Sequence, residues 1–579
     1  MIPPERGRAQ QENSLLRIEA HTGLRLRPFF WCLAIALGAL QVWAHRNEMN
    51  PDGISYIELG WAAARSGLHQ IVNAYWSPLY PFLLSLVFRY FHPSPQWEFT
   101  ATHLLNFVVY LLSLAAFELF LDELLIARQA AEDLSQKSIS VESRTLRVWG
   151  YVFFLWASYF WLGPAWVTPD LCVSVIVFFA MAVLLWKRRS GDKWTTFAVL
   201  GGLLGLGYLA KAAMFPLSFV FLFSAFYVRR RAGASLPGTT LGTLLAAGVF
   251  AAFALPFAMS LSSQKGRPTF GDSARINYVE YVDAGPKWVH WQGKPEGTGT
   301  PLHPTRRVFS DPDIYEFSSA MPASYAPWYD PSYWYDGVQP HFLWRGQSLA
   351  LWRAANVYLK IFSKSGALWV VLIVVLWLLH RKMLAQSDSV PGEWLILLPL
   401  VAPPAMYALV HVEFRFIAPF GLMLLVWALT KLRVAAGAQP LLLKRSLRVL
   451  TLAPVLAMVW PVAHDVGEVI ANRPYEHWEV AVGLHEMGIP SGTEAGSIGS
   501  GSGAYWAHLA GVKIIAEIPE KDQTSFLAAD PARKEEALHK FSELGAKAVV
   551  MKNSSAAQSM DGWQEVGETR YYVWRPAGH

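Results

Sequence analysis

Cysteine and charge are both scarce in this sequence. Of its 579 residues only 2 are cysteine, and 16% are Asp, Glu, Lys or Arg, against roughly 25% in ordinary soluble domains. Cys32 and Cys172 both lie within apolar runs, so we expect them to fill space rather than to form a disulfide. The composition also excludes a disordered chain, because disorder goes with low hydrophobicity.

Apolar and aromatic residues are abundant instead, with 53% hydrophobic residues, 26 Trp and 33 Phe. A helix needs about 20 mostly apolar residues to cross a bilayer. About eleven runs meet or approach that length, at 29–45, 101–122, 147–163, 170–186, 194–210, 212–228, 239–261, 366–380, 394–411, 416–430 and 446–464. The sequence therefore predicts a mainly α, polytopic membrane protein. We expect the shorter stretch 77–91 to be a re-entrant or interface-parallel helix.

Basic residues near the ends of these runs predict the orientation, because Lys and Arg concentrate in cytoplasmic loops. If the N-terminus is cytoplasmic, every inside loop is basic, for example at 187–189 and 229–231, whereas the outside connections carry few Lys or Arg. We therefore expect a multi-pass protein of the inner or plasma membrane with its C-terminus outside. The first run resembles a signal peptide's start but has no clean cleavage site, so we expect a retained anchor.

The predicted organisation has three parts. These are a cytoplasmic tail at 1–28, a transmembrane module at 29–466 with outer loops at 47–100 and 262–365, and an extracytoplasmic α/β domain at 467–579. In the last part we expect helices near 476–488 and 533–544 and strands near 512–518, 546–552 and 570–575. The glycine-rich GSGSG at 499–503 is weakly similar to a dinucleotide loop, but a flexible loop is the favoured interpretation outside the membrane.

Charged residues beside the predicted spans are candidates for function, because they are costly there. Asp52, Asp170, Lys211, Glu413 and Arg415 all fall on the outer side in the predicted topology. Each has a simpler explanation: the two aspartates suit turns or helix caps, the lysine could snorkel to head groups, and Glu413 and Arg415 could form a structural ion pair. Their shared face favours one outward-facing site.

This set of residues suits sugar transfer from a lipid phosphate. Aromatic faces and carboxylates bind sugar rings, and a lysine at membrane depth is a compact partner for phosphate. A fixed cation stabilises the charge that gathers on a leaving phosphate, and a carboxylate can act as general base. A divalent metal ion is the one candidate cofactor, and Asp52 and Asp170 could hold it only if they converge.

The motifs, in their order, resemble the GT-C superfamily of lipid-phosphate-sugar glycosyltransferases, in particular its bacterial protein-mannosyltransferase-like and lipid A aminoarabinose-transferase-like branches. The matching segments are Asp52 with Tyr56, AYWSPLYP (74–81), TPD (168–170), G-x-G-x-x-x-K (205–211) and H-x-E-x-R-F-x-x-P (411–419). The resemblance covers about 29–430. It implies a GT-C-type bundle with an extracytoplasmic loop.

The resemblance also implies roles for individual residues. Asp52 would be the catalytic base, Asp170 a second acidic residue at the site, and Lys211, with Arg415, a ligand of the donor phosphate. We expect substrate contacts from Tyr56, Tyr75, Trp76, Tyr80, His411 and Glu413. The sequence departs from the pattern at Glu58, which stands six residues after Asp52 where relatives have adjacent acidic residues.

The resulting hypothesis is a hexosyl- or pentosyltransferase of the cell envelope. It would use a polyprenyl-phosphate-sugar donor and a lipid, glycan or protein acceptor, within the bilayer and with no nucleic acid. A polytopic transporter or flippase is the alternative, and it predicts inverted repeats and broken helices near mid-membrane. A non-catalytic glycan-binding subunit would have lost Asp52 and Lys211.

Overall fold

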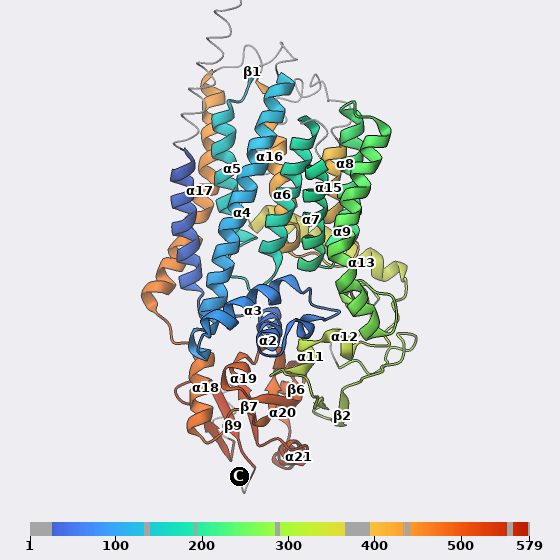
Figure 1. Cartoon of the computed structure of the whole chain (residues 1–579). Coiled ribbons are helices and arrows are strands. Elements are labelled where there is room, and N and C mark those ends of the chain that lie inside the picture. The colour runs from blue at the N-terminus through green and yellow to red at the C-terminus, as the bar shows by residue number, and fades with distance from the viewer. Residues whose placement is uncertain are drawn as a thin grey trace, which may run out of the picture.

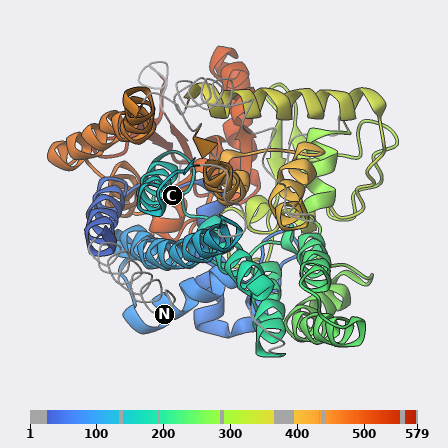
Figure 2. The same ribbon diagram turned by 90° about the horizontal axis from the view of Figure 1, so that it is seen from above.

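The computed structural model describes residues 26–132, 139–189, 194–283, 290–364, 394–431, 433–434, 440–552 and 560–576. A bundle of long helices makes up one part, and outer loops and a smaller α/β part lie at one end of it (Figure 1). Figure 2 shows the helices of the bundle from above, packed side by side. The protein is thus mainly helical with a C-terminal sheet domain, as the sequence predicts.

The helices of the bundle coincide with every predicted apolar run except 366–380, which lies outside the described residues. They are a first helix Leu26–Ala44, α4 (Pro95–Glu132), α5 (Ser143–Phe160), α6 (Asp170–Arg189), α7 (Trp194–Ala210), α8 (Met214–Arg231), α9 (Leu236–Lys265), α15 (Trp394–Ala408), α16 (Phe414–Thr430) and α17 (Pro440–Ala471). A short pair of strands, β1 (Ile139–Ser140) and β4 (Arg433–Val434), joins the other end of the bundle.

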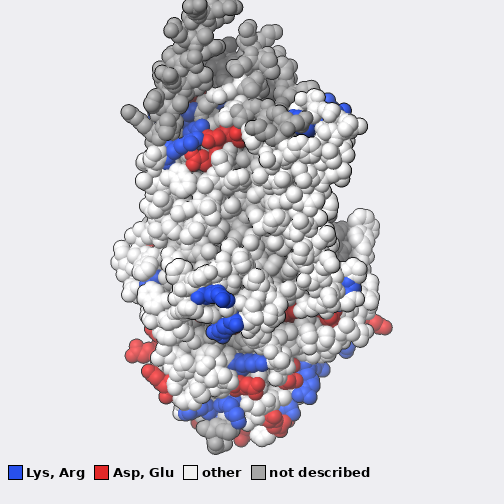
Figure 3. All heavy atoms as spheres, in the orientation of Figure 1, with Lys and Arg blue, Asp and Glu red and all other residues white. Residues whose placement is uncertain are grey.

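The predicted count of eleven spans is not confirmed. Among the described residues, 4 helical stretches are long and apolar enough to cross a membrane: Leu26–Ala44, Pro95–Gln129, Leu236–Lys265 and Arg448–Glu486. Several others, such as α7 and α16, are apolar but have only 17 residues, below the usual length of about 20. On the face of the molecule drawn in Figure 3, the middle of the bundle is almost without charged residues, and Lys, Arg, Asp and Glu gather toward its two ends. The chain is a multi-pass membrane protein.

Short helices from the two outer loops lie across the lower end of the bundle in Figure 1. The first loop forms α2 (Pro51–Ser66), η1 (Leu68–Ile71) and α3 (Leu79–Phe91). Its α3 matches the expected short helix at 77–91. The second loop forms α10 (Ser273–Tyr281), β2 (Arg306–Phe309), β3 (Ile314–Glu316), α11 (Ala326–Tyr329), α12 (Pro331–Trp334) and α13 (Trp344–Lys364).

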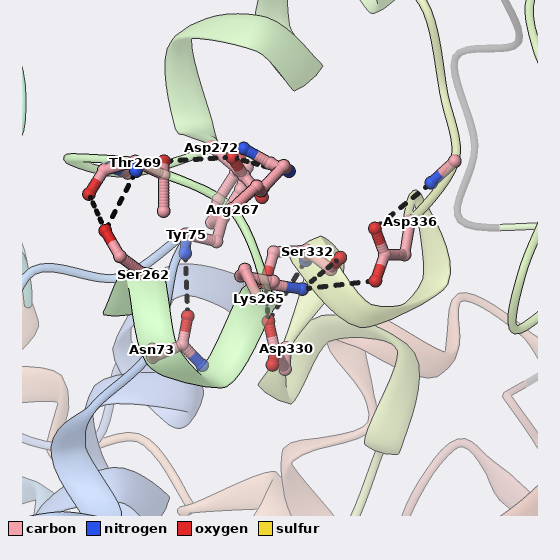
Figure 4. A network of polar contacts seen from close by, with 12 residues as sticks. Asn73, Tyr75, Ser262, Lys265, Arg267, Thr269, Asp272, Asp330, Ser332 and Asp336 are labelled. Carbon is pink, nitrogen blue, oxygen red and sulfur yellow. Dashed lines mark hydrogen bonds and ion pairs between the residues drawn. The ribbon is translucent and has the colours of Figure 1, made fainter. Parts of the chain in front are cut away.

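A network of polar contacts holds the C-terminal end of α9 against this second loop (Figure 4). Lys265, the last residue of α9, donates a hydrogen bond from Nζ to the carbonyl oxygen of Ser332 (2.9 Å), and the Asp330 carboxylate accepts from the Ser332 amide (3.0 Å). Arg267 pairs with the buried Asp272 at 2.6 Å. These contacts hold α10 and α12 against the end of the bundle, beside the segment that carries Tyr75.

The C-terminal part contains the predicted α/β elements and several additional ones. The predicted helices and strands appear as α18 (Glu476–Glu486), α21 (Pro531–Glu543), β6 (Lys513–Pro519), β7 (Ala548–Lys552) and β9 (Tyr571–Trp574). The additional elements are β5 (Glu494–Gly499), η2 (Gly501–Gly503), α19 (Tyr505–Ala510), α20 (Glu520–Ala528) and β8 (Trp563–Glu565).

The sheet of this part crosses the predicted domain boundary at 467. Its strand order is β2-β3-β6-β5-β7-β9-β8, with β5 parallel to β6 and β7, so two strands of the second outer loop complete it. The buried Glu517 of β6 accepts hydrogen bonds from Tyr325 Oη (2.7 Å) and lies 2.6 Å from His290 Nε2. The outer loop and the C-terminal sheet therefore form one continuous structure.

A buried histidine joins the C-terminal part to the membrane module. His508 of α19 lies between two carboxylates, with Nδ1 3.2 Å from Glu58 of α2 and Nε2 2.6 Å from Glu98 of α4. Glu58 also accepts hydrogen bonds from the amide and hydroxyl of Ser324. Burial alone would lower the pKa of His508, but the two carboxylates raise it to about 10.

Candidate functional site

The five charged residues singled out in the sequence come together at the lower end of the bundle. The Arg415 guanidinium is the centre of the group: Nη2 lies 2.9 Å from Asp52, Nε 2.7 Å from Glu413, and Nη1 3.6 Å from Asp170. Lys211 Nζ completes it at 2.6 Å from Asp170. Residues up to 363 positions apart thus form one cluster of three carboxylates and two cations.

Helix ends explain why the charges lie there. Asp52 and Asp170 occupy the first turns of α2 and α6, where the helix dipole favours negative charge. Lys211 directly follows the C-terminus of α7, where the dipole favours positive charge. Because these ends face the same side of the bundle, their side chains meet. Glu413 stands at the N-cap of α16 but makes no capping hydrogen bond with its side chain.

The charged cluster is partly buried and is not a surface patch. The Asp170 side chain is only 6% exposed and that of Glu413 is 38% exposed, with the other three between them. Burial raises the pKa of the Asp52 carboxyl above its ordinary value, against the effect of Arg415. For Glu413, burial is outweighed by hydrogen bonds and charge from His411 and Arg415, which lower its pKa to about 2.

An aromatic ring covers the lysine. Lys211 Nζ lies 3.5 Å from the centroid of the Phe416 ring, a cation–π contact that is stronger where water is excluded. The ammonium is therefore held between a carboxylate and a ring, and its position is fixed from two sides. A phosphate that reached this place would meet a partly desolvated cation, whose interaction is stronger than in water.

The predicted substrate-binding aromatic residues differ in their contact partners. The Tyr80 side chain is buried, and its hydroxyl donates to Asn106 Oδ1 (2.7 Å). Trp76 is buried too and donates from Nε1 to the carbonyl oxygen of Trp328 (3.1 Å). Tyr56 packs edge-on against both, at 5.0 Å from Trp76 and 5.3 Å from Tyr80. The contacts observed for Trp76 and Tyr80 are with protein, and their binding roles stay predictions.

Tyr56 and Tyr75 are the predicted substrate-binding tyrosines whose pKa is influenced by acidic residues of the site. Burial and the charges of Asp52 and Asp170 raise the pKa of Tyr56, and burial and the charges of Glu280 and Asp52 raise that of Tyr75. Tyr75 is only partly buried. The substrate-binding roles of these two rings also stay predictions.

His411 connects the site to a neighbouring cavity. Its Nε2 lies 3.4 Å from Glu413 Oε1, and its ring stacks on Tyr281 of α10 at 4.0 Å. A cavity of about 540 Å³ between α13 and the segment before α16 is lined by residues that include His411, Val412, Tyr281, Arg353 and Trp352. Sequence reasoning missed Tyr281, because its partner His411 lies 130 residues away along the chain.

The residues present do not fit a divalent metal ion. Asp52 and Asp170 do converge, but both face the guanidinium of Arg415, which stands where a shared cation would be. In the described part of the chain, no group of three or more His, Cys, Asp and Glu side chains could hold a metal. The arrangement instead supplies its own positive charge.

No protein-family model matches the sequence, and no curated protein sequence matches it. The fold does have solved counterparts. The structure is similar to that of ArnT from Cupriavidus metallidurans in the apo state, with a TM-score of 0.50 and 13% identity over 96% of this chain and 98% of that one. The chain has a GT-C-type fold.

A second ArnT structure, bound to undecaprenyl phosphate, gives the same TM-score of 0.50 at 12% identity, over 95% of this chain and 98% of ArnT. ArnT is a lipid A aminoarabinose transferase. The archaeal oligosaccharyltransferase AglB from Archaeoglobus fulgidus is more distant, with a TM-score of 0.45 and 13% identity over 91% of this chain and 70% of that one. The likeness to ArnT over nearly the whole of both chains confirms the GT-C-type fold that the motifs predicted.

Proposed function

We propose that this protein is a membrane glycosyltransferase that moves one sugar from a polyprenyl-phosphate-linked donor to an acceptor on the extracytoplasmic side. The observation that carries the proposal is the cluster of Asp52, Asp170, Lys211, Glu413 and Arg415 at one end of a GT-C-type bundle. A transporter or flippase would need its charges near mid-membrane, whereas these gather at the helix ends.

The chemistry follows from the charges. Arg415 and Lys211 would hold the phosphate of the donor, and Asp52 would accept the proton of the acceptor hydroxyl. The hydroxyl oxygen forms the new bond to the anomeric carbon while the bond from that carbon to the phosphate oxygen breaks, and the bonding pair leaves with the phosphate. The cations stabilise the negative charge that grows there. Attack opposite the leaving group inverts the anomeric carbon, as the GT-C resemblance implies.

Asp170 has a supporting role in this scheme. It lies 2.6 Å from Lys211 and 3.6 Å from Arg415, so it holds both cations at one place. Its burial makes it a poor partner for an acceptor.

The proposal also covers the substrates and the topology. The sugar would be a hexose or pentose, and the acceptor a lipid, glycan or protein. The N-terminus would lie in the cytoplasm and the α/β part outside.

A transfer assay with purified protein in nanodiscs tests the proposal. The donors would be polyprenyl-phosphate sugars, and Asp52→Asn is the decisive variant because it keeps size and polarity but removes the base. Transfer should fall by roughly 10²–10⁴-fold, the usual contribution of general-base catalysis, while donor binding persists. Full activity in a folded Asp52→Asn protein would return this residue to a turn-forming role. The matched control is Glu316→Gln, which removes the charge of an acid paired with Arg306 in the outer sheet.

A further inference from the structure

Arg415, the cation that would receive the donor phosphate, is already paired with carboxylates. Arg415 faces three carboxylates at once, and Lys211 faces one of these. A phosphate cannot approach Arg415 closely unless one carboxylate gives way, because like charges at short range repel in a poorly solvated site. One of the three acids must therefore be displaceable.

Glu413 is the acid of the three that is most accessible to solvent. It is the most exposed of the three side chains, at 38% against 23% for Asp52 and 6% for Asp170. Asp170 has a second partner in Lys211. Glu413 stands at the N-cap of α16 but caps no backbone amide, so its departure leaves the helix end unchanged.

A cavity near Glu413 could receive its side chain once the contact with Arg415 is broken. Its Oε1 lies 3.4 Å from His411 Nε2, and His411 and Val412 line the cavity of about 540 Å³ that extends toward α13. A rotation of the Glu413 side chain toward that cavity would keep the contact with His411 and release the Nε side of Arg415. The bond given up is the one at 2.7 Å between Glu413 and Arg415.

We propose that Glu413 is a resident counter-ion, which the donor phosphate displaces from Arg415 and which returns to expel the polyprenyl phosphate product. This inference rests on the proposed function. The donor is a phosphodiester with one negative charge, and cleavage of the sugar–oxygen bond leaves a monoester that carries up to two. The product would otherwise bind the two cations more tightly than the donor did. Glu413 is thus a positioning residue that acts through Arg415.

The test is a gain of binding, which damage to the fold would not produce. The probe is a polyprenyl monophosphate titrated into wild-type and Glu413→Gln protein in nanodiscs of neutral lipid, followed by tryptophan fluorescence. Removing a unit charge a few ångströms from the phosphate should lower Kd by about tenfold. Glu413→Ser provides a second neutral variant, in which a good N-cap residue protects the helix end.

Enzyme kinetics should show whether Glu413 helps to expel the polyprenyl phosphate product. In Glu413→Gln, KM for the donor and kcat should both fall, and the first turnover should appear as a burst because product release has become slow. The control Glu316→Gln removes the same charge from another acid–arginine pair, and it should leave Kd and kcat unchanged.

The outcomes separate the two proposals. If wild-type protein binds polyprenyl phosphate but Glu413→Gln and Glu413→Ser bind it equally well or more weakly, the counter-ion role is wrong and the proposed function stands. If wild-type protein does not bind polyprenyl phosphate at all, the proposed function fails and the counter-ion role falls with it.

Discussion

The histidine between the C-terminal part and the membrane module should make their docking depend on pH. His508 is 12% exposed in its side chain and contacts Glu58 and Glu98, and its pKa is raised from 6.5 to about 10. When α19 leaves this place, the imidazole should return to an ordinary pKa near 6.5. Because the docked pKa is the higher one, the stabilisation is fully present below about pH 6.5 and is lost as pH rises toward 10.

The size of the effect follows from the shift. A difference of about 3.5 pKa units corresponds to about 5 kcal/mol when His508 is protonated in both states, at 1.36 kcal/mol per unit. By the same linkage, about 3 kcal/mol remains at pH 8 and less than 1 kcal/mol at pH 10. Both figures compare the docked state with the undocked one.

Amide hydrogen exchange of the peptide that contains α19 (Tyr505–Ala510) measures this directly. After correction for the intrinsic exchange rate, protection should decrease by roughly two to three orders of magnitude between pH 6.5 and 10. In His508→Gln the protection should be low throughout, because two buried carboxylates then face each other without a cation. Adding Glu98→Gln should restore part of it.

Two comparisons test whether His508 causes the pH dependence of protection in α19. His539→Gln removes an exposed histidine of α21 that pairs with Glu543, and it should leave the profile of α19 unchanged. A protection profile that is flat from pH 6.5 to 10 in the wild type would refute the reasoning, as would a His508→Gln profile with the wild-type slope.

Two further predictions concern the donor site and the topology. Lys211→Ala should weaken donor binding and slow transfer together, because the ammonium pairs with phosphate in both ground and transition states; Lys211→Arg should restore only part, since a planar fork does not replace a point charge. A reporter fused after residue 579 should be active only outside the cytosol and one fused near Arg230 only inside, and a cytosolic C-terminus would overturn the orientation on which the proposed donor access depends.

The bundle and the charged cluster could be predicted because both depend on local signals. Apolar runs give helices without knowledge of their neighbours, and charges at helix ends fall on the same side once the chain alternates direction. The motifs order Asp52, Asp170, Lys211, Glu413 and Arg415 along the chain, and the structure brings them within 4 Å of one another in pairs. Short helices made the span count harder, since α7 and α16 are apolar but below the usual spanning length.

The sheet could not be predicted in full because its central strand, which precedes the GSGSG segment, has only a weak strand pattern. β5 has the sequence EAGSIG, with small residues where β-branched ones are usual. The reason is packing: a side chain at Gly496 would come within 2.4 Å of Phe541 of α21. The pairing of β3 with β6 is also invisible in the sequence, since the two strands lie about 200 residues apart.

Glu58 and His508 are the residues whose importance the sequence least revealed. Glu58 was singled out only as a departure from the motif of relatives, and His508 lies 450 positions further along the chain. A contact of that separation leaves no periodicity and no spacing to recognise. The structure assigns Glu58 to the attachment of the C-terminal part rather than to the cluster around Arg415.

The outer strands lead to a last prediction about the C-terminal part. The sequence predicts that 467–579 folds alone, and in the full chain its β6 pairs with β3, so that Tyr315 lies opposite Glu517 and Glu316 opposite Ala516. Ile314 of β3 is fully buried against the same core as Phe541. A fragment of 467–579 should be soluble and melt cooperatively, but it lacks this contribution.

Fusing residues 290–330 to that fragment should therefore raise its Tm. Burial of one isoleucine contributes about 1.5–3 kcal/mol, which corresponds to roughly 5–15 °C for a domain of this size. Ile314→Ala in the fused fragment should remove most of the gain, whereas Arg306→Ala, at an exposed position of β2, should not. Equal melting temperatures for the two fragments would show that the outer loop is held by the sheet without stabilising it, and a gradual melt of both would show that the sheet needs the membrane module to fold.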